Sequence, residues 1–479
     1  MPISLSSTAL PFLTTSLHLD WLRSVLFGIT PPPDLTIRPA SGSLLAVSYL
    51  STCLALGILS AMTLPERTNT TAWKWFRFIS WLIVVKLSVD FSIDPAVSLG
   101  APLRDMVMPL LGWNALARMT DLCVVSVWDG EERDRAPRWI VPAGSKLLRG
   151  VKEGGEANGQ AQVASSKDTL MQWKVVPHSQ YPLLSLRRLL WALDHISLLR
   201  PGTSWFLPAE QRALEWSLPI LTQPAKPHHH RFFARSEGLP YLITSVVLSA
   251  AGAPMFMRMM SSIPQSSTGT GADNFYALKW WEQGFIPLWI GLNVPLQWTV
   301  METLFLFPLT RRFHILPSTA LLPAFAHPLL ASGPTDLWGR RWHPFVRRTA
   351  WRNASLFVPR SWGAWGSRLG SFVITGSLHG WAVIRWIRPL PPSTLHALVV
   401  LLLPGPMALF VGQGVACVLE LLLLGPPPAG RGEEKGWRAW ARWVWLWVSV
   451  AWMGRWFIAT IVSLGMATTE SHEGAWKWV

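Results

Sequence analysis

Long hydrophobic runs with almost no charge are the feature that most limits how this chain can fold. Five such runs occupy residues 44–64, 239–257, 284–309, 397–424 and 443–466. Each is long enough to cross the hydrocarbon core of a bilayer as a helix, which needs about 20 apolar residues. Three weaker runs, at residues 73–91, 106–127 and 369–387, carry charges or are shorter. We therefore predict an all-α, polytopic integral membrane protein with about 7–9 transmembrane helices.

The composition favours a membrane protein over the soluble classes. Hydrophobic residues make up 50% of the 479 residues and charged residues only 14%, against roughly a quarter charged residues in ordinary soluble domains. The chain has 31 Trp, 4 Tyr and a net charge of +15. Trp and Arg both favour the boundary between the apolar core and the headgroups of a bilayer. With only three cysteines, this composition argues against a disulfide scaffold, a disordered chain and a conventional soluble enzyme.

A polar segment divides the hydrophobic runs into two groups. Residues 129–168 are rich in Gly, Ser and Ala and contain clustered charges, which is typical of a solvated loop. We therefore expect N-terminal membrane helices over residues 1–128, a polar loop over 129–184 and a membrane core over 185–479.

A second loop contains three consecutive histidines, His228, His229 and His230. Consecutive side chains point in different directions and seldom converge on one ion. We interpret this stretch as a basic loop beside the membrane rather than as a metal site, and we expect no metal.

The stretch between Asp336 and Glu420 contains no acidic residue. It carries nine arginines, namely Arg340, Arg341, Arg347, Arg348, Arg352, Arg360, Arg368, Arg385 and Arg388. Basic loops mark the cytosolic side of a membrane protein, so we expect residues 337–369 to face the cytosol. The alternative is an electropositive site for a polyanion such as a nucleotide diphosphate, because guanidinium groups bind phosphate with two parallel hydrogen bonds. The arginines lie between Trp-rich apolar runs, so we expect no nucleic acid partner.

Two histidines stand out from the twelve. His379 lies in an apolar segment rich in small residues, where an ionisable side chain is costly and therefore a functional candidate. His343 follows Trp338 and Trp342, which are four residues apart and share one face of a helix. Pro344 disfavours the α conformation at His343, so we expect a helix to end there. The alternatives are a structural histidine and an amphipathic helix at the membrane surface.

These two segments resemble a known family. Leu337-Trp-Gly-Arg-Arg-Trp-His343, followed 36 residues later by His379 in Ser377-Leu-His379, resembles the paired signature of membrane-bound O-acyltransferases. The similarity is greatest to the fungal wax-synthase-like branch. The stretch 410–420, with Gln413 and Glu420, resembles a later helix of that family. The resemblance covers roughly residues 185 to 465. Leu337 and Pro344 depart from the family pattern, as does Pro201 in an upstream block at residues 191–202.

The resemblance implies a fold like that of membrane-bound O-acyltransferases and transfer of an acyl group from acyl-CoA to a hydroxyl. His379 would be the general base that removes the hydroxyl proton. His343 would orient the substrate or polarise the thioester carbonyl. Arg340 and Arg341 would hold phosphates of the donor or fix the motif at the membrane surface.

The other motif residues are expected beside them. Trp338 and Trp342 would contact the acyl-CoA, and the remaining motif positions are Asp336, Gly339, Gln413 and Glu420. Acyl-CoA is a co-substrate, and no permanently bound cofactor is implied. Acetyl transfer to a terpenoid or meroterpenoid, in the endoplasmic reticulum membrane, is preferred to wax-ester synthesis on long-chain alcohols.

Functions of other classes remain open at this point. A transporter is expected to have intramembrane charges paired across helices, and many transporters have a repeated half. Glu302, Arg455 and His379 are candidate intramembrane charges, but the sequence shows no repeat. A membrane-embedded structural or receptor protein is the third possibility.

Overall fold

The structure is a computed structural model of the chain, and it describes part of the 479 residues. The described residues are 39–63, 71–93, 107–125, 139–142, 173–175, 213–214, 238–263, 275–301, 327–382, 404–425 and 436–463, with short pieces between 182 and 193 and residue 325. The three histidines at 228–230, the upstream block at 191–202 and Glu302 lie wholly or almost wholly outside them.

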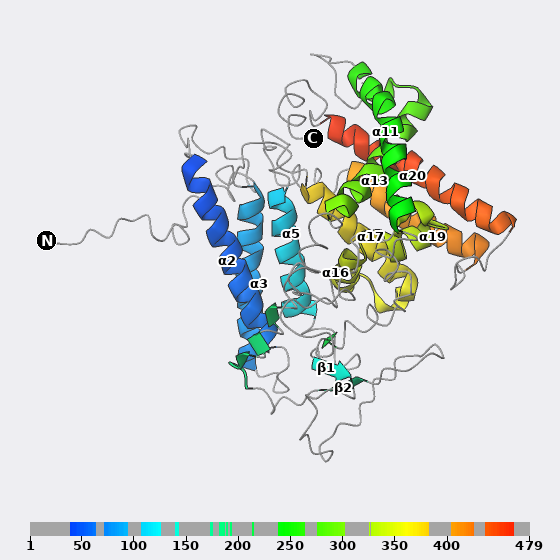
Figure 1. Ribbon diagram of the computed structural model, residues 1–479. Helices are drawn as coiled ribbons and strands as arrows, with labels where there is room; N and C mark the ends of the chain where they lie inside the picture. The colour runs from blue at the N-terminus through cyan, green and yellow to red at the C-terminus, as the bar shows by residue number, and fades with distance from the viewer. Residues whose placement is uncertain are drawn as a thin grey trace.

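Three helices form the N-terminal group, and they lie side by side in Figure 1. They are α2 (Pro39–Thr63), α3 (Thr71–Ile93) and α5 (Val107–Thr120), and α5 continues into the π-helical turn η3 (Asp121–Val125). Their apolar faces enclose a core that includes Ala61, Val84 and Leu122. Beside this core, the rings of Tyr49 and Phe91 meet edge to face with centroids 6.0 Å apart.

Five longer helices form the C-terminal group. They are α11 (Gly238–Ser262), α13 (Trp280–Met301), α17 (Gly363–Ala382), α19 (Pro404–Leu424) and α20 (Trp437–Ser463). Helix α20 packs against both α13 and α19. A Cβ added at Gly412 would meet the Met453 side chain, and one added at Gly454 would lie 2.6 Å from Pro287 Cβ. Glycine at these contacts lets the helix axes approach closely.

Short elements carry the tryptophan-rich motif into this helix group. They are η10 (Pro328–Leu330), α15 (Pro334–Asp336), the π-helical turn η11 (Leu337–Arg341), α16 (Pro344–Ala354) and η12 (Arg360–Trp362). Leu337 packs with Ala331 and with Leu446 of α20. The motif is therefore buried against α20 and is not an isolated helix on the membrane surface.

A small sheet departs from the all-α prediction. Strands β1 (Trp139–Pro142), β2 (Trp173–Val175) and β3 (Ala213–Leu214) form an antiparallel sheet in the order β2-β1-β3. Ile140 pairs with Val175 and also with Ala213. Two of the strands fall within residues 129–184, where we predicted only a loop. Their Trp, Ile and Val residues have high strand propensity, but they are short and isolated within a polar stretch.

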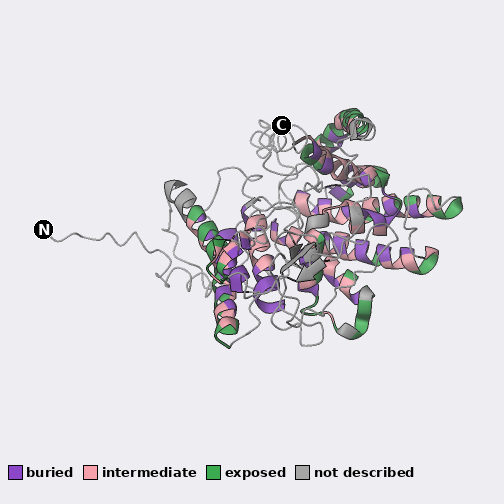
Figure 2. Ribbon diagram, turned by 60° about the horizontal axis from the view of Figure 1, so that its bottom comes forward, coloured by how far each residue is buried: buried purple, intermediate pink, exposed green. Residues whose placement is uncertain are grey.

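Within the described part of the chain, four helices are long and apolar enough to cross a membrane. The candidate spans are Ala46–Thr63, Leu242–Ser262, Gly405–Leu424 and Trp437–Val462. Their outward side chains include Val47, Val247, Leu423 and Trp440, all more than half exposed. Figure 2 shows such exposed residues on the outer helices, with buried residues where helices face one another. Exposed apolar surface of this extent suits a lipid environment, so the prediction of helices that are long and apolar enough to cross a membrane is confirmed for these four.

Polar contacts between described residues join the two helix groups. Arg352 Nε lies 2.8 Å from Asp121 Oδ1, and Asn353 Nδ2 donates to Ala117 O at 3.0 Å. Trp381 Nε1 donates to Ser92 Oγ at 2.8 Å. The N-terminal group therefore contacts α16, which follows His343, and α17, which carries His379.

Candidate functional site

The motif changes direction sharply at His343. The turn η11 ends where Trp342 N donates to Leu337 O at 2.7 Å. His343 then has a left-handed backbone with φ of 44°, and Pro344 begins α16. Left-handed geometry costs a residue other than glycine roughly 1–2 kcal/mol. The helix boundary expected at Pro344 is confirmed.

The Trp338 indole joins the motif to α19. Its Nε1 donates to Gln413 Oε1 at 2.9 Å. Its ring meets those of Trp342, Phe372 and Phe410, with centroids 5.4, 5.9 and 5.6 Å away. Two motif positions 75 residues apart in the sequence, Trp338 and Gln413, are therefore in direct contact.

His379 lies near the end of α17 with a defined tautomer. Its Nδ1 is 2.8 Å from Thr375 O. A carbonyl oxygen only accepts hydrogen bonds, so Nδ1 carries the hydrogen and Nε2 keeps a lone pair. The ring packs against Phe410 with centroids 4.1 Å apart and against Phe457 at 6.1 Å. In the neutral form of His379, Nε2 is therefore the ring nitrogen that can accept a proton.

His343 lies in the same aromatic cluster, outside the four candidate spans. Its ring is 4.2 Å from the Phe325 ring and 5.7 Å from the Trp342 ring, measured between centroids. Burial lowers the pKa of His343, and the nearby His379 ring lowers it further. The rings of Trp342, Trp338 and Phe410 form a continuous set of contacts from His343 to His379. The structure therefore brings together the two histidines singled out from the sequence.

Arg341 and Asp336 pair with each other inside the motif. Arg341 Nε lies 2.7 Å from Asp336 Oδ2, and its Nη1 donates to His327 O at 3.2 Å. Asp336 also accepts from the Ser332 amide at 3.1 Å. Of the two roles expected for Arg341, these contacts favour fixing the motif over binding phosphate.

The remaining arginines of the acid-free stretch have varied surroundings. Arg347 Nη1 donates to the carbonyl of Gly339 at 2.7 Å, and the Arg368 guanidinium lies 5.5 Å from the Trp365 ring centroid. Nothing lies within 4 Å of a Cβ added at Gly339, so crowding does not explain this glycine. The structure does not describe the side chains of three other arginines, Arg340, Arg348 and Arg360. Arg385 and Arg388 lie wholly outside the described residues.

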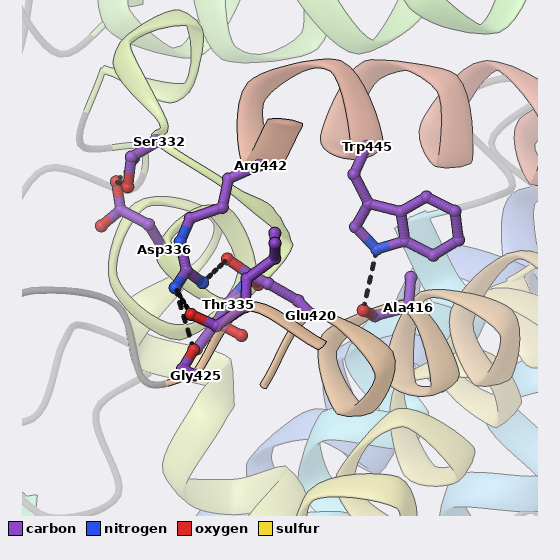
Figure 3. Close-up of polar contacts among 9 residues, drawn as sticks. Ser332, Thr335, Asp336, Ala416, Glu420, Gly425, Arg442 and Trp445 are labelled. Atoms are coloured by element: carbon purple, nitrogen blue, oxygen red, sulfur yellow. Dashed lines mark hydrogen bonds and ion pairs between the residues drawn. The ribbon is translucent and has the colours of Figure 1, made fainter. Parts of the chain in front are cut away.

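Glu420 has a partner that the motifs did not indicate. Its Oε1 lies 2.9 Å from Arg442 Nη1, and both side chains are fully buried. Its Oε2 accepts from the Thr335 amide at 2.7 Å. Figure 3 shows Arg442 of α20 between this carboxylate and the carbonyl of Gly425. Arg442 belongs to a Trp- and Arg-rich stretch at the start of α20, and its composition alone suggests only an interfacial residue.

Among the residues that the structure describes, no group of three or more His, Cys, Asp or Glu side chains is placed to hold a metal ion. No protein-family model, no curated protein and no solved structure matches this chain.

Proposed function

We propose that the protein is a membrane O-acyltransferase that uses acyl-CoA. The observation that carries this proposal is the convergence of His343 and His379 on one aromatic cluster, with His379 Nδ1 held by Thr375 O. This arrangement leaves Nε2 of a neutral imidazole as a base. An alcohol is a poor nucleophile until a base takes its proton, so such a group is the one that ester formation needs.

In the proposed reaction, His379 Nε2 accepts the hydroxyl proton while the alcohol oxygen attacks the thioester carbonyl carbon. The carbon–sulfur bond then breaks, and the thiolate of CoA leaves with the proton returned from the imidazolium. His343 orients the donor or polarises its carbonyl. Trp338 and Trp342 contact the acyl-CoA, and Arg340 remains the proposed phosphate ligand, with Arg341 as a positioning residue. No acyl-enzyme forms, so no catalytic Ser or Cys is required.

The donor and acceptor are proposed from the sequence resemblance. We propose acetyl-CoA and a hydroxylated terpenoid or meroterpenoid, with long-chain alcohols as the alternative acceptors. The finer topology is also a proposal: about 7–9 membrane helices, in the endoplasmic reticulum, with residues 337–369 on the cytosolic side.

Sealed microsomes from an expressing host test this function. They are given labelled acetyl-CoA, which does not cross the bilayer, with either hydroxylated terpenoids or fatty alcohols. We expect labelled ester from the terpenoid panel. We expect His379→Ala to lower ester formation by about 100-fold or more, which is the usual contribution of a general base.

The matched control is His396→Ala, the same substitution at a histidine outside both motifs, which should leave ester formation unchanged. Equal activity of the His379→Ala protein and the wild type would exclude His379 as the base. Ester formation only after the microsomes are opened would place the donor site in the lumen.

One observation favours a second function, membrane transport. The buried pair of Glu420 and Arg442 joins two helices, as intramembrane charges in transporters do. In that case, substrate uptake into vesicles would not need acyl-CoA and would leave no ester. Acyl transfer remains the better supported function, because both histidines of the predicted pair contact rings of one aromatic cluster.

A further inference from the structure

Helices α19 and α20 contact each other through two polar pairs in a single antiparallel register. Gln413 faces Ser449, whose Oγ lies 3.5 Å from Gln413 Oε1, and Glu420 faces Arg442. Gln413 and Glu420 are seven residues apart, as are Arg442 and Ser449. Seven residues make about two helical turns, so each set lies on one face of its helix.

Each pair also holds one point of the motif. The Gln413 side chain accepts the Trp338 indole hydrogen at 2.9 Å. The Glu420 carboxylate accepts the Thr335 amide hydrogen at 2.7 Å. The motif segment is therefore held at two positions three residues apart, one on either side of the start of the π-helical turn η11.

The Glu420–Arg442 pair is fully shielded from solvent and well satisfied. Arg442 Nη2 donates to Leu424 O at 2.7 Å and to Gly425 O at 3.0 Å, at the carboxyl end of α19. A Cβ added at Gly333 would collide with Glu420 Oε1, so the motif loop lies directly on the carboxylate. Replacing a buried ion pair by apolar residues of similar size is often neutral or stabilising. Stability alone therefore does not account for charges at this place.

We propose that Arg442 is a positioning residue for the proposed acyl transfer. It holds the Glu420 carboxylate on the Thr335 amide, and this contact sets the motif turn that carries Trp338 and His343 toward His379. The inference rests on the proposed function, because it assigns the role through the two histidines. Arg442 contacts no reacting group itself.

The test is the double variant Glu420→Met with Arg442→Leu, purified in nanodiscs. It removes both charges and the acceptor for the Thr335 amide while keeping side-chain volume. We expect the double variant to remain folded, because no buried charge is left unpaired, with a lower unfolding temperature because the Thr335 amide and the Leu424 and Gly425 carbonyls lose hydrogen-bond partners. We expect kcat to fall by about 10- to 100-fold through misplacement of the motif, with KM for acetyl-CoA little changed.

The matched control is Trp445→Phe. Trp445 Nε1 donates to Ala416 O at 3.0 Å (Figure 3), and both residues lie between the two polar pairs along their helices. This variant loses a contact between α19 and α20 without touching the motif, so kcat should stay at the wild-type value. A wild-type kcat in the folded double variant would overturn the proposal, as would an equal loss in the control.

A second variant covers the case in which the double variant does not fold. Arg442→Lys keeps the charge and loses the fork that reaches both Glu420 and the α19 carbonyls. We expect this protein to fold and to lose part of kcat, again with KM little changed. A wild-type kcat in Arg442→Lys would then count against the proposal.

Hydrogen–deuterium exchange gives a readout that needs no substrate. Peptides covering residues 331–343 should exchange faster in the double variant than in the wild type, while α19 and α20 peptides remain protected. If the wild type makes no ester, the proposed function fails, and this measurement still tests whether the pair holds the motif. Unchanged exchange of residues 331–343 would refute the positioning role.

Discussion

At the scale of single residues, the site depends on which atoms are already engaged. The Nδ1 hydrogen of His379 is held by Thr375 O, so the proton-accepting nitrogen is determined by the helix that carries the ring. The Arg341 guanidinium is held by Asp336, which favours support of the motif over the expected contact with phosphate. The contacts of a side chain, rather than its residue type, therefore separate the proposed catalytic groups from the residues that support the motif.

The bond between Trp338 and Gln413 can be tested by a double-mutant cycle. Trp338→Phe keeps an aromatic ring and leaves Gln413 Oε1 without its indole donor, so we expect a loss of about 1–3 kcal/mol in the free energy of unfolding. Gln413→Met removes the other partner. The double variant should lose less than the sum of the two single losses, as measured by denaturant unfolding in micelles. Fully additive losses would show that the bond contributes nothing.

At the scale of elements, helix packing depends on a few glycines. Gly454 of α20 lies against Pro287 of α13, and a Cβ added at Gly454 would be 2.6 Å from Pro287 Cβ. A larger residue must push the two helices apart, because interiors are close-packed and adjust little.

We expect Gly454→Ala to lower the free energy of unfolding by about 1–3 kcal/mol through overpacking. The control is Gly291→Ala in α13, where nothing lies within 4 Å of the added Cβ and where alanine favours the helix. Thermal unfolding in detergent measures both variants. An equal effect of the two substitutions would rule out close packing as the reason for Gly454.

Helix positions followed from the sequence better than helix boundaries did. Four of the five long hydrophobic runs overlap the candidate spans, because apolar length is a local property that the residues carry themselves. The run at 284–309 corresponds to α13, which contains Pro287 and Pro295 and is not among the four. The strands β1 and β2 were missed, because two- to four-residue strands have no periodic pattern of their own.

At the scale of the whole molecule, the N-terminal helices are bound to the helices of the site. The Arg352–Asp121 pair joins α16 to η3, with 17% and 4% of the two side chains exposed. Breaking a buried ion pair leaves an uncompensated charge, so this contact ties the position of α16 to the N-terminal group.

Asp121→Asn tests that connection. We expect it to lower the free energy of unfolding by about 3 kcal/mol, since the Arg352 guanidinium loses the carboxylate charge beside it in a largely buried position. Lys86→Gln is the control, because the Lys86–Asp90 pair within α3 has Lys86 53% exposed and such pairs contribute about 0.5 kcal/mol. Chemical unfolding of both variants gives the comparison. A loss at Asp121 no larger than that at Lys86 would show that the two helix groups do not depend on this pair.

The sequence by itself determined the class of the molecule and the segments that carry its candidate chemistry. Apolar length indicates membrane helices, and the Trp-Gly-Arg-Arg-Trp-His block with His379 indicates the candidate site, because both are properties of neighbouring residues. Only the tertiary structure decided which groups meet: Glu420 with Arg442, Trp338 with Gln413, and His343 with the cluster around His379. These contacts depend on the register of α19 against α20 and on the left-handed turn at His343. Packing over the whole molecule sets both, and no local pattern encodes them.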